Sequence, residues 1–354
     1  MNQNKKIKFG VIGAGKIGTF HTRTLAKMPE VELIGVSDVD MLRAQTLAWN
    51  YNAVAYNNYE DLFPQVDALV VAVPTEHHAE IAVKAMNRGI HCLVEKPIAD
   101  SIDNARKIME AAEKNGVVMQ VGHVERFNPA VVEAVKHIKN PMYINMERMG
   151  PYDPRVSSIG VTLDLMIHDL DILLSIVNSP IDSIESIGAS VLSKHDDISQ
   201  SRVKFKNGVI ADLTASRITF ERLRRMRIYQ DGEYISVDYI SSRIKIYRKK
   251  NDPPKTLKDI DIINPKIEKK EPIKEELYHM IDCIKNSKNP IPSGEKGLNA
   301  LKLALEITDK IKRYDLPRNP DVVEKSKMFE QINDTFKAVK VIAEEKLKQK
   351  GIDR

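Results

Sequence analysis

A glycine-rich loop near the N-terminus constrains the fold of this chain more than any other feature of its sequence. The loop contains Gly13, Ala14, Gly15, Lys16, Ile17 and Gly18. It follows a short apolar segment, 7–12, and opens an amphipathic segment that is typical of a helix. In this setting the first glycine permits a tight turn, the second lets a pyrophosphate approach the backbone, and the third lets the helix pack against the strand. The pattern predicts a dinucleotide-binding βαβ unit whose helix N-terminus faces the phosphates.

An acidic residue, Asp38, ends the second predicted strand, 31–38, about 20 residues after the loop, which is the spacing of dinucleotide-binding folds. A carboxylate at this position accepts hydrogen bonds from the ribose hydroxyls of NAD and repels the 2′-phosphate of NADP. Arg43 lies nearby and partly offsets that repulsion. We expect the cofactor to be NAD, bound by Asp38 and by Gly13, Gly15, Lys16, Ile17 and Gly18 of the loop.

Apolar strands continue to alternate with amphipathic helices as far as about residue 123. Further strands are predicted at 68–73, 91–95 and 117–121, with helices between them. Short strands that alternate with helices are typical of a parallel sheet with helices on both faces. The sequence therefore predicts an α/β Rossmann domain, a doubly wound parallel sheet, over residues 1–123.

Beyond this point the pattern changes: a strand is predicted at 143–149 and is followed by a helix over 161–177. After that helix, extended segments follow one another without intervening helices, at 183–192, 201–205, 209–218, 225–230, 234–239 and 243–247. Asn207-Gly208 and Asp231-Gly232 favour hairpin turns. Residues 124–318 are therefore expected to form an α+β domain with a mostly antiparallel sheet covered by helices on one face. One of these is a long helix over 161–177, and residues 319–354 are expected to form a helical extension.

Composition excludes several other classes of protein. The 354 residues carry a net charge of only +5, and the lysines of 243–274 are interspersed with acidic residues, which favours a solvated surface over a nucleic-acid interface. No apolar run approaches the ~20 residues of a membrane span, and the polar N-terminus does not have the form of a signal peptide. Cys92 and Cys283 lack metal-ligand or CxxC spacing. We expect a cytoplasmic protein with reduced thiols, no bound metal and no membrane insertion.

Two short motifs follow predicted strands at the edge of the sheet where ligands of open α/β folds bind. In Pro74-Thr75-x-x-His78, the histidine lines the nicotinamide side, caps a helix or lies on the surface. The second motif reads Glu95-Lys96-Pro97. Proline disfavours helix at the preceding residue, so Lys96 is expected to be extended. There it either contacts the substrate hydroxyl or cofactor ribose, or is a surface lysine before a turn.

Asp164 and His168 lie four residues apart in the predicted long helix and therefore share a face. A histidine that is oriented by a carboxylate is a usual general base for a hydroxyl proton. A solvated ion pair fits the same spacing equally well, and the sequence does not separate the two interpretations.

Taken together, these motifs, in their order and spacing, resemble the Gfo/Idh/MocA oxidoreductases over about residues 7–315. The resemblance implies a Rossmann domain followed by a domain with a large open sheet, through which homodimers or homotetramers assemble. It implies hydride transfer between NAD(P) and a sugar or polyol carbon. It also places Lys96, Asp164 and His168 at catalytic positions, and Pro97 at a position that is often cis. The cofactor contacts implied outside the glycine loop are Pro74, Thr75, His78, Glu95, Lys96 and Pro97.

A narrower resemblance, carried by 122–129 and 164–171, is to the UDP-N-acetylglucosamine 3-dehydrogenases. Those enzymes oxidise the C3 hydroxyl to a ketone, which an aminotransferase converts to a 3-amino sugar for amide-linked lipid A. The substrate contacts expected on this basis are Lys96, Arg126, Asn128, Tyr152, Arg155, Asp164 and His168. Arg126 has a structural alternative, in which it ties the second domain to the first. The remaining alternatives are a dehydrogenase for a UDP-uronic acid, a free sugar or an inositol, and a non-catalytic NAD(P)-binding regulator.

Overall fold

The computed structural model of the protein describes residues 5–153 and 159–313. The predictions for Arg155 and for the helical extension 319–354 lie outside the described residues. Residues up to Lys312 form one compact unit. No helix in the described ranges is long and apolar enough to cross a bilayer.

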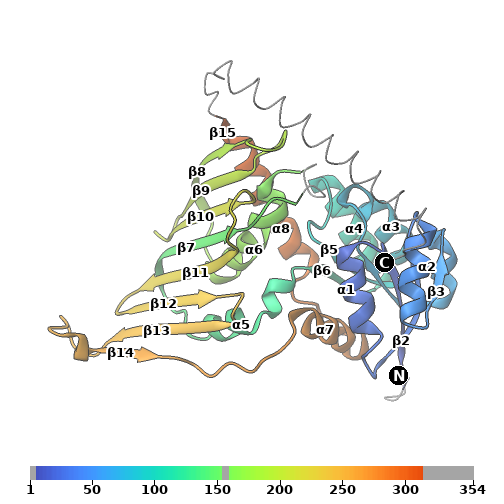
Figure 1. Cartoon of the computed structure of the whole chain (residues 1–354), viewed down its shortest axis with the longest axis horizontal. Helices are drawn as coiled ribbons and strands as arrows, with labels where there is room; N and C mark the ends of the chain where they lie inside the picture. Colours follow the sequence, from blue (N-terminus) through green and yellow to red (C-terminus); the bar gives the residue numbers. More distant parts are fainter. Residues whose placement is uncertain (1–4, 154–158, 314–354) are drawn as a thin grey trace, which may run out of the picture. The chain divides into compact units, whose positions relative to one another are not determined.

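Six strands of the described chain form a parallel sheet in the order β3-β2-β1-β4-β5-β6 (Figure 1). The strands are β1 (Ile7–Ile12), β2 (Val31–Ser37), β3 (Val54–Tyr56), β4 (Ala68–Val71), β5 (His91–Glu95) and β6 (Met119–Gly122). The helices between them are α1 (Lys16–Leu25), α2 (Met41–Asn50), the 3₁₀ helices η1 (Tyr59–Gln65) and η2 (Thr75–His77), α3 (His78–Met86) and α4 (Ile102–Asn115). The predicted doubly wound sheet is confirmed. Its short edge strand β3 was not predicted, because three residues carry too little periodicity.

Both faces of this sheet are buried, as the continuous apolar runs of its strands require. Phe9 and Val11 of β1 pack towards α1 and α7 (Pro272–Asn286), whereas Ile12 lies in the core formed with α3 and α4. After β3 the chain crosses back, so β4 lies on the other side of β1 from β2. The carboxyl ends of β1 and β4 therefore flank the point where the strand order reverses, which is where open α/β sheets bind ligands.

The second sheet has the strand order β14-β13-β12-β11-β7-β10-β9-β8-β15 in the described residues. Its strands are β7 (Pro141–Met149), β8 (Ile181–Ala189), β9 (Ile198–Phe205), β10 (Ile210–Ser216), β11 (Leu223–Gln230), β12 (Glu233–Asp238), β13 (Arg243–Lys249), β14 (Ile260–Ile263) and β15 (Lys312–Arg313). All the registered pairings are antiparallel except that of β7 with β10. This confirms the predicted mostly antiparallel sheet. Strand β14 was not predicted, because it lies in the segment 253–272, which is rich in proline and lysine.

One face of the second sheet is covered by helices (Figure 1). They are α5 (Pro129–Val135), α6 (Ile167–Ile176) and α8 (Gly294–Lys310), with the 3₁₀ helices η3 (Val124–Phe127) and η6 (Leu257–Asp259) and the π-helical turn η5 (Thr162–Met166) in the connections. Alternate residues of β7, such as Ile144 and Met146, point into the core with residues of α5, α6 and α8. The pattern of one buried residue in two follows from the period of a strand that has one covered face.

The last two helices also pack on the parallel sheet. Leu277 and Met280 of α7 lie in the core with Phe9, and Leu298 of α8 lies in the core with Val121. The hydrophobic pattern did not reveal this return of α7 and α8 to the first sheet. The division of the chain into domains at 1–123 and 124–318 stays a prediction.

Candidate functional site

The glycine loop lies between β1 and α1, and two of its glycines are required by the backbone. Gly13 has φ +103°, and a Cβ there would lie 2.3 Å from the main-chain oxygen of Ala72. A Cβ on Gly18 would lie 1.7 Å from the main-chain oxygen of Gly13. Gly15 differs, because within the described structure nothing lies within 4 Å of the Cβ position. This open approach to the backbone, next to the exposed start of α1 at Lys16 and Ile17, has the form of a phosphate site.

Asp38 follows β2 and is tied to the same loop. Its carboxylate accepts the N–H of Ala14 at 2.6 Å through Oδ2 and the N–H of Asp40 at 2.8 Å through Oδ1. These bonds fix the carboxylate beside the glycine loop while leaving it partly exposed. Its predicted hydrogen bonds with the ribose hydroxyls stay a prediction.

His78 neither caps a helix through its side chain nor lies on the surface. The side chain is buried, with Nδ1 2.9 Å from the main-chain oxygen of Pro97 and Nε2 2.9 Å from that of Val73. Burial lowers the pKa of His78, although these carbonyls raise it. A neutral imidazole has one N–H and so donates to one of the two carbonyls. The predicted nicotinamide contact stays a prediction. His78 links the turn after β4, where Pro74 and Thr75 lie, to the turn that carries Lys96.

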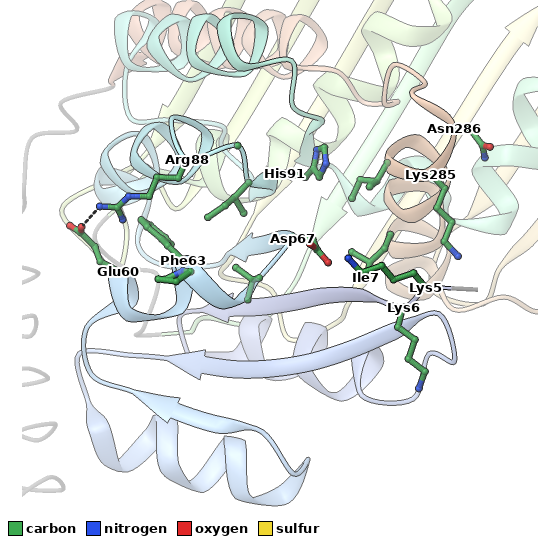
Figure 2. A pocket seen from close by; sticks show the side chains of 15 residues that line it. Lys5, Lys6, Ile7, Glu60, Phe63, Asp67, Arg88, His91, Lys285 and Asn286 are labelled. Carbon is green, nitrogen blue, oxygen red and sulfur yellow. Dashed lines mark hydrogen bonds and ion pairs between the residues drawn. The ribbon is translucent and has the colours of Figure 1, made fainter. Parts of the chain in front are cut away.

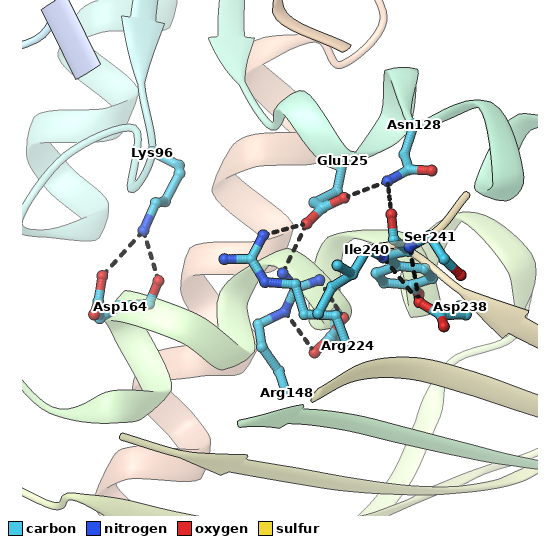
Figure 3. A network of polar contacts seen from close by, with 11 residues as sticks. Lys96, Glu125, Asn128, Arg148, Asp164, Arg224, Asp238, Ile240 and Ser241 are labelled. Carbon is cyan, nitrogen blue, oxygen red and sulfur yellow. Dashed lines mark hydrogen bonds and ion pairs between the residues drawn. The ribbon is translucent and has the colours of Figure 1, made fainter. Parts of the chain in front are cut away.

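Lys96 follows β5 and is joined to Pro97 by a cis peptide bond. Its Nζ donates to the main-chain oxygen of Asp164 at 2.6 Å and lies 3.3 Å from Oδ1 of the same residue (Figure 3). Both side chains are mostly buried, with 17% and 16% exposed. The structure therefore brings the lysine of one motif and the aspartate of the other together.

The sequence predicted that Asp164 pairs with His168 on a regular helix, and the structure differs. Residues Thr162–Met166 form a π-helical turn before α6 begins at Ile167. A π turn has more residues per turn than an α-helix, so the i, i+4 relationship of an α-helical face does not apply across it. The Asp164 carboxylate meets Lys96 instead, and its predicted role as the residue that orients His168 is replaced by that of a partner of Lys96.

His168 lies in a mostly buried environment with several cations nearby. Burial lowers its pKa well below the usual range, and the charges of Lys96 and Arg148 lower it further. The imidazole is therefore neutral at physiological pH and can accept a proton. Its Nδ1 is buried, and nothing in the described part of the chain hydrogen-bonds to it.

A second histidine, His123, lies beside His168 and was missed as a site residue. The two rings meet edge-to-face with centroids 6.5 Å apart. Both nitrogens of His123 are buried without a hydrogen-bond partner among the residues described, and burial lowers its pKa. His123 directly follows β6, at the same sheet edge as Lys96. A position directly after a parallel strand is the signal that identified Lys96 in the sequence, and it could have identified His123 as well.

Arg126 and Asn128 were predicted to hold the substrate, and each is occupied by protein groups. The Arg126 guanidinium contacts Asp171 through Nε at 2.5 Å and Nη2 at 3.0 Å, and Asp171 is buried. The buried Asn128 donates to Glu125 and to the main-chain oxygen of Tyr239, and its own oxygen caps α5 at Ala130. Asn128 thus acts as a helix cap with both of its N–H groups used, and its predicted contact with substrate stays a prediction.

A buried ionic network that the sequence did not reveal includes Asp169, the residue after His168, and Figure 3 shows its members Arg148, Glu125 and Arg224. Arg148 of β7 donates to both carboxylate oxygens of Asp169, at 2.8 and 3.0 Å, and to Glu125 at 2.8 Å. Arg224 adds a contact to Glu125 at 3.3 Å. The available signal was an arginine at an inward-facing position of an otherwise apolar strand pattern.

Tyr152 contacts a different part of the second domain. The guanidinium of Arg217 lies over its ring, 5.9 Å from the ring centroid. Arg217 is buried and pairs with Asp197 at 2.7 Å. The structure thus connects Tyr152 to this pair, and its predicted contact with substrate stays a prediction.

A large cavity of about 980 Å³ is separate from this site (Figure 2). Its lining includes Ile7 and His91, which begin β1 and β5, and Phe63 of η1. Because the strands are parallel, these residues lie at the edge of the sheet opposite to the glycine loop and Lys96. The cavity is therefore remote from the side chains that the sequence motifs bring together.

Comparison with known proteins places this geometry in a family. Residues 7–123 match the model described as oxidoreductase family, NAD-binding Rossmann fold, and residues 137–235 match the GFO/IDH/MocA C-terminal domain. The chain is 29% identical over 306 residues to UDP-N-acetylglucosamine 3-dehydrogenase of Acidithiobacillus ferrooxidans, covering 85% of this chain and 96% of that protein. A solved structure of that enzyme superposes with a TM-score of 0.80, covering 86% of this chain and 98% of the other.

Other relatives act on different substrates. The chain is 26% identical over 344 residues to scyllo-inositol 2-dehydrogenase (NAD(+)) of Bacillus subtilis, covering 90% of this chain and 97% of that protein. The structure of a levoglucosan dehydrogenase in complex with NADH has a TM-score of 0.78 at 16% identity, covering 86% of this chain and 97% of the other, which shows a shared fold.

Proposed function

Because the chain belongs to the Gfo/Idh/MocA oxidoreductase family, with its NAD-binding Rossmann fold, we propose that it oxidises the C3 hydroxyl of UDP-N-acetylglucosamine. The observation that carries the dehydrogenase chemistry is the contact of Lys96 with Asp164 beside a neutral His168. A non-catalytic regulator would have no need to keep a base unprotonated next to a paired lysine.

Removal of a hydride from an alcohol carbon requires that the hydroxyl proton also leaves. Bound NAD⁺ supplies the acceptor for the hydride. His168 is the proposed base, because its lowered pKa leaves the imidazole free to accept the hydroxyl proton. Lys96 supplies positive charge where the alkoxide forms, and Asp164 holds the Lys96 ammonium through the 2.6 Å bond to its main-chain oxygen.

The nucleotide-sugar substrate is supported by the relative from Acidithiobacillus ferrooxidans, which aligns with nearly its whole length. The Arg126 side chain supports a nucleotide-sugar substrate less than the sequence suggested, because Asp171 already neutralises the guanidinium. The product would then serve a transaminase for a 3-amino sugar of the lipid A type. Assembly as a homodimer or homotetramer through the second sheet remains part of this proposal.

The test is a direct assay. Purified protein is incubated with NAD⁺ and UDP-N-acetylglucosamine, NADH formation is followed, and the product is analysed by mass spectrometry and NMR. A loss of two hydrogens with a ketone at C3 supports the proposal. A ketone at another ring position contradicts only the assignment of the oxidised carbon.

An inositol is the second candidate substrate, and the similarity to scyllo-inositol 2-dehydrogenase favours it. An inositol carries no diphosphate, so the pairing of Arg126 with Asp171 is compatible with it. The same assay with scyllo- and myo-inositol separates the two: NADH from an inositol but not from UDP-N-acetylglucosamine would overturn the nucleotide-sugar proposal.

A further inference from the structure

Three ionisable side chains form a buried cluster next to Lys96. They are His21 of α1, Glu95 at the end of β5 and Glu276 of α7, and one nitrogen or carboxylate oxygen of each lies within 4.8 Å of the others. The histidine and Glu276 are fully buried. The cluster joins helix α7, from the C-terminal part of the chain, to the strand that presents Lys96.

Glu95 is the centre of the cluster and is held as an ionised carboxylate. Its Oε1 lies 2.7 Å from Nε2 of His21, and its Oε2 accepts the main-chain N–H of Lys96 at 3.2 Å. A Cβ on Gly122 would lie 2.9 Å from the same Oε2, so glycine is needed there to admit the carboxylate. Burial raises the pKa of Glu95, but the contacts with His21 and Lys96 outweigh it and lower the pKa.

Glu276 has no such partners. Within the described ranges 5–153 and 159–313, neither of its carboxyl oxygens makes a hydrogen bond. The groups around it are His21 from α1, Glu95 from β5 and Gln120 from β6, whose amide donates to the main-chain oxygen of Glu276 at 3.1 Å. Burial raises the pKa of Glu276 well above its ordinary value, and the charge of Glu95 raises it further. An ionised carboxylate without partners in this place would be strongly unfavourable.

We propose that Glu276 is a positioning residue for Lys96, which holds one proton in the His21–Glu95–Glu276 cluster and so limits the cluster to a single negative charge. Loss of this proton gives the cluster a second negative charge, which competes with Asp164 for the Lys96 ammonium. The inference rests on the role proposed above for Lys96.

The first test follows stability against pH and needs no substrate. Glu276→Gln keeps the size of the side chain and cannot ionise, and Glu275→Gln, at a more exposed neighbour that contacts Lys270, is the matched control. The stability that a raised carboxyl pKa contributes is fully present below the unfolded pKa and is lost as pH rises through the folded pKa. From pH ~5 to ~9, the Tm of the wild type should therefore fall relative to that of Glu276→Gln, while Glu275→Gln follows the wild type. A Tm difference that does not change with pH overturns the proposal.

The second test follows the effect of this charge on turnover. Glu276→Gln and Glu276→Leu cannot ionise, so only the wild type can gain the second negative charge in the cluster. As pH rises from ~5 to ~9, the kcat of the wild type should therefore fall relative to the kcat of both variants, while the KM for NAD⁺ changes less than about twofold. A ratio of wild-type to variant kcat that does not change with pH, or one equivalent of metal in the purified protein, would overturn the proposal in favour of packing or of a metal site. If UDP-N-acetylglucosamine is not oxidised but the Tm series behaves as expected, the substrate proposal fails and the charge assignment stands. In that case kcat is measured with whichever inositol is oxidised in the assay described above.

Discussion

Lys96 donates through Nζ to the main-chain oxygen of Asp164 at 2.6 Å, which joins the end of β5 to the π-helical turn before α6. This bond links the two sheets at the point where the chain's catalytic motifs meet. It gives Asp164 a different task from the one that the sequence suggested, since its carboxylate lies 3.3 Å from the same ammonium. The lysine cation is thereby held near His168, whose pKa it lowers.

The first prediction concerns the two groups that are proposed to act on the hydroxyl. Lys96→Ala and His168→Ala should each lose ~10²–10⁴ in kcat, because a positioned base or charge at the reacting oxygen is removed. Both variants should still bind NADH, as measured by fluorescence titration, since the glycine loop and Asp38 are unchanged. His77→Ala, at an exposed neighbour of the site motif, is the control. Near-normal turnover in either variant would refute the role given to that residue.

The second prediction concerns pH. Burial and then Lys96 lower the pKa of His168, so the base stays neutral below its ordinary pKa of ~6.5, and the acid limb of kcat/KM should lie below that pH. Replacing Lys96 with Gln removes a positive charge and should raise the His168 pKa towards its ordinary value. An NMR titration of the imidazole measures this shift without turnover. A lower or unchanged pKa in Lys96→Gln would show that the lysine charge does not act on His168.

The third prediction concerns the preference for NAD over NADP. Asp38→Ala removes a carboxylate that is fixed by the N–H groups of Ala14 and Asp40 and is placed for the ribose. A charged hydrogen bond contributes about 1.5–3 kcal/mol, so kcat/KM for NAD⁺ should fall about 10–100-fold and the NADP⁺ value should rise relative to it. Asp40→Asn, which retains a helix-capping side chain, is the control for loss of a nearby charge. The assignment fails if NADP⁺ already equals NAD⁺ in the wild type.

The sequence predicted the parts of this structure that depend on local patterns. Gly13 and Gly18 were identifiable because their turn and packing admit no side chain, and the apolar runs identified the parallel strands. Contacts between distant segments were not predictable in this way. Lys96 and Asp164 are 68 residues apart in the chain, and the π turn that contains Asp164 leaves no hydrophobic signature.

The hydrogen bonds of buried polar groups were also not predictable from the sequence. His78 and Asn128 belong to motifs that suggested ligand contacts, but each satisfies main-chain groups that would otherwise be buried without partners. A motif gives the residue type and its position in the sequence. Whether that side chain bonds to the protein's own main chain or to a ligand depends on the tertiary fold. Glu276 was overlooked for the same reason, since its helix reads as an ordinary amphipathic one and returns to the first sheet.

The fourth prediction tests the structural role of His78. His78→Phe keeps a ring but removes the partners of the Pro97 and Val73 carbonyls, which should destabilise the protein by about 1–3 kcal/mol. Urea denaturation measures the change in the free energy of unfolding, with the exposed His77→Phe as the control. Because the Lys96 turn depends on the same contact, kcat should also decrease. An unchanged free energy of unfolding would contradict this structural role and favour the predicted ligand contact of His78.

The last prediction decides whether Arg126 binds substrate or ties the fold together. Asp171 is buried and only 2% of its side chain is exposed, so Arg126→Ala leaves a carboxylate without its cation. Loss of one partner of a buried pair costs about 3–5 kcal/mol, whereas replacing both partners by apolar groups is often nearly neutral. We therefore expect Arg126→Ala to unfold at lower urea concentration, and Arg126→Met combined with Asp171→Leu to recover most of the stability. A substrate contact predicts the opposite pattern. In that case, the KM for UDP-N-acetylglucosamine rises in both variants while the free energy of unfolding of Arg126→Ala stays near that of the wild type.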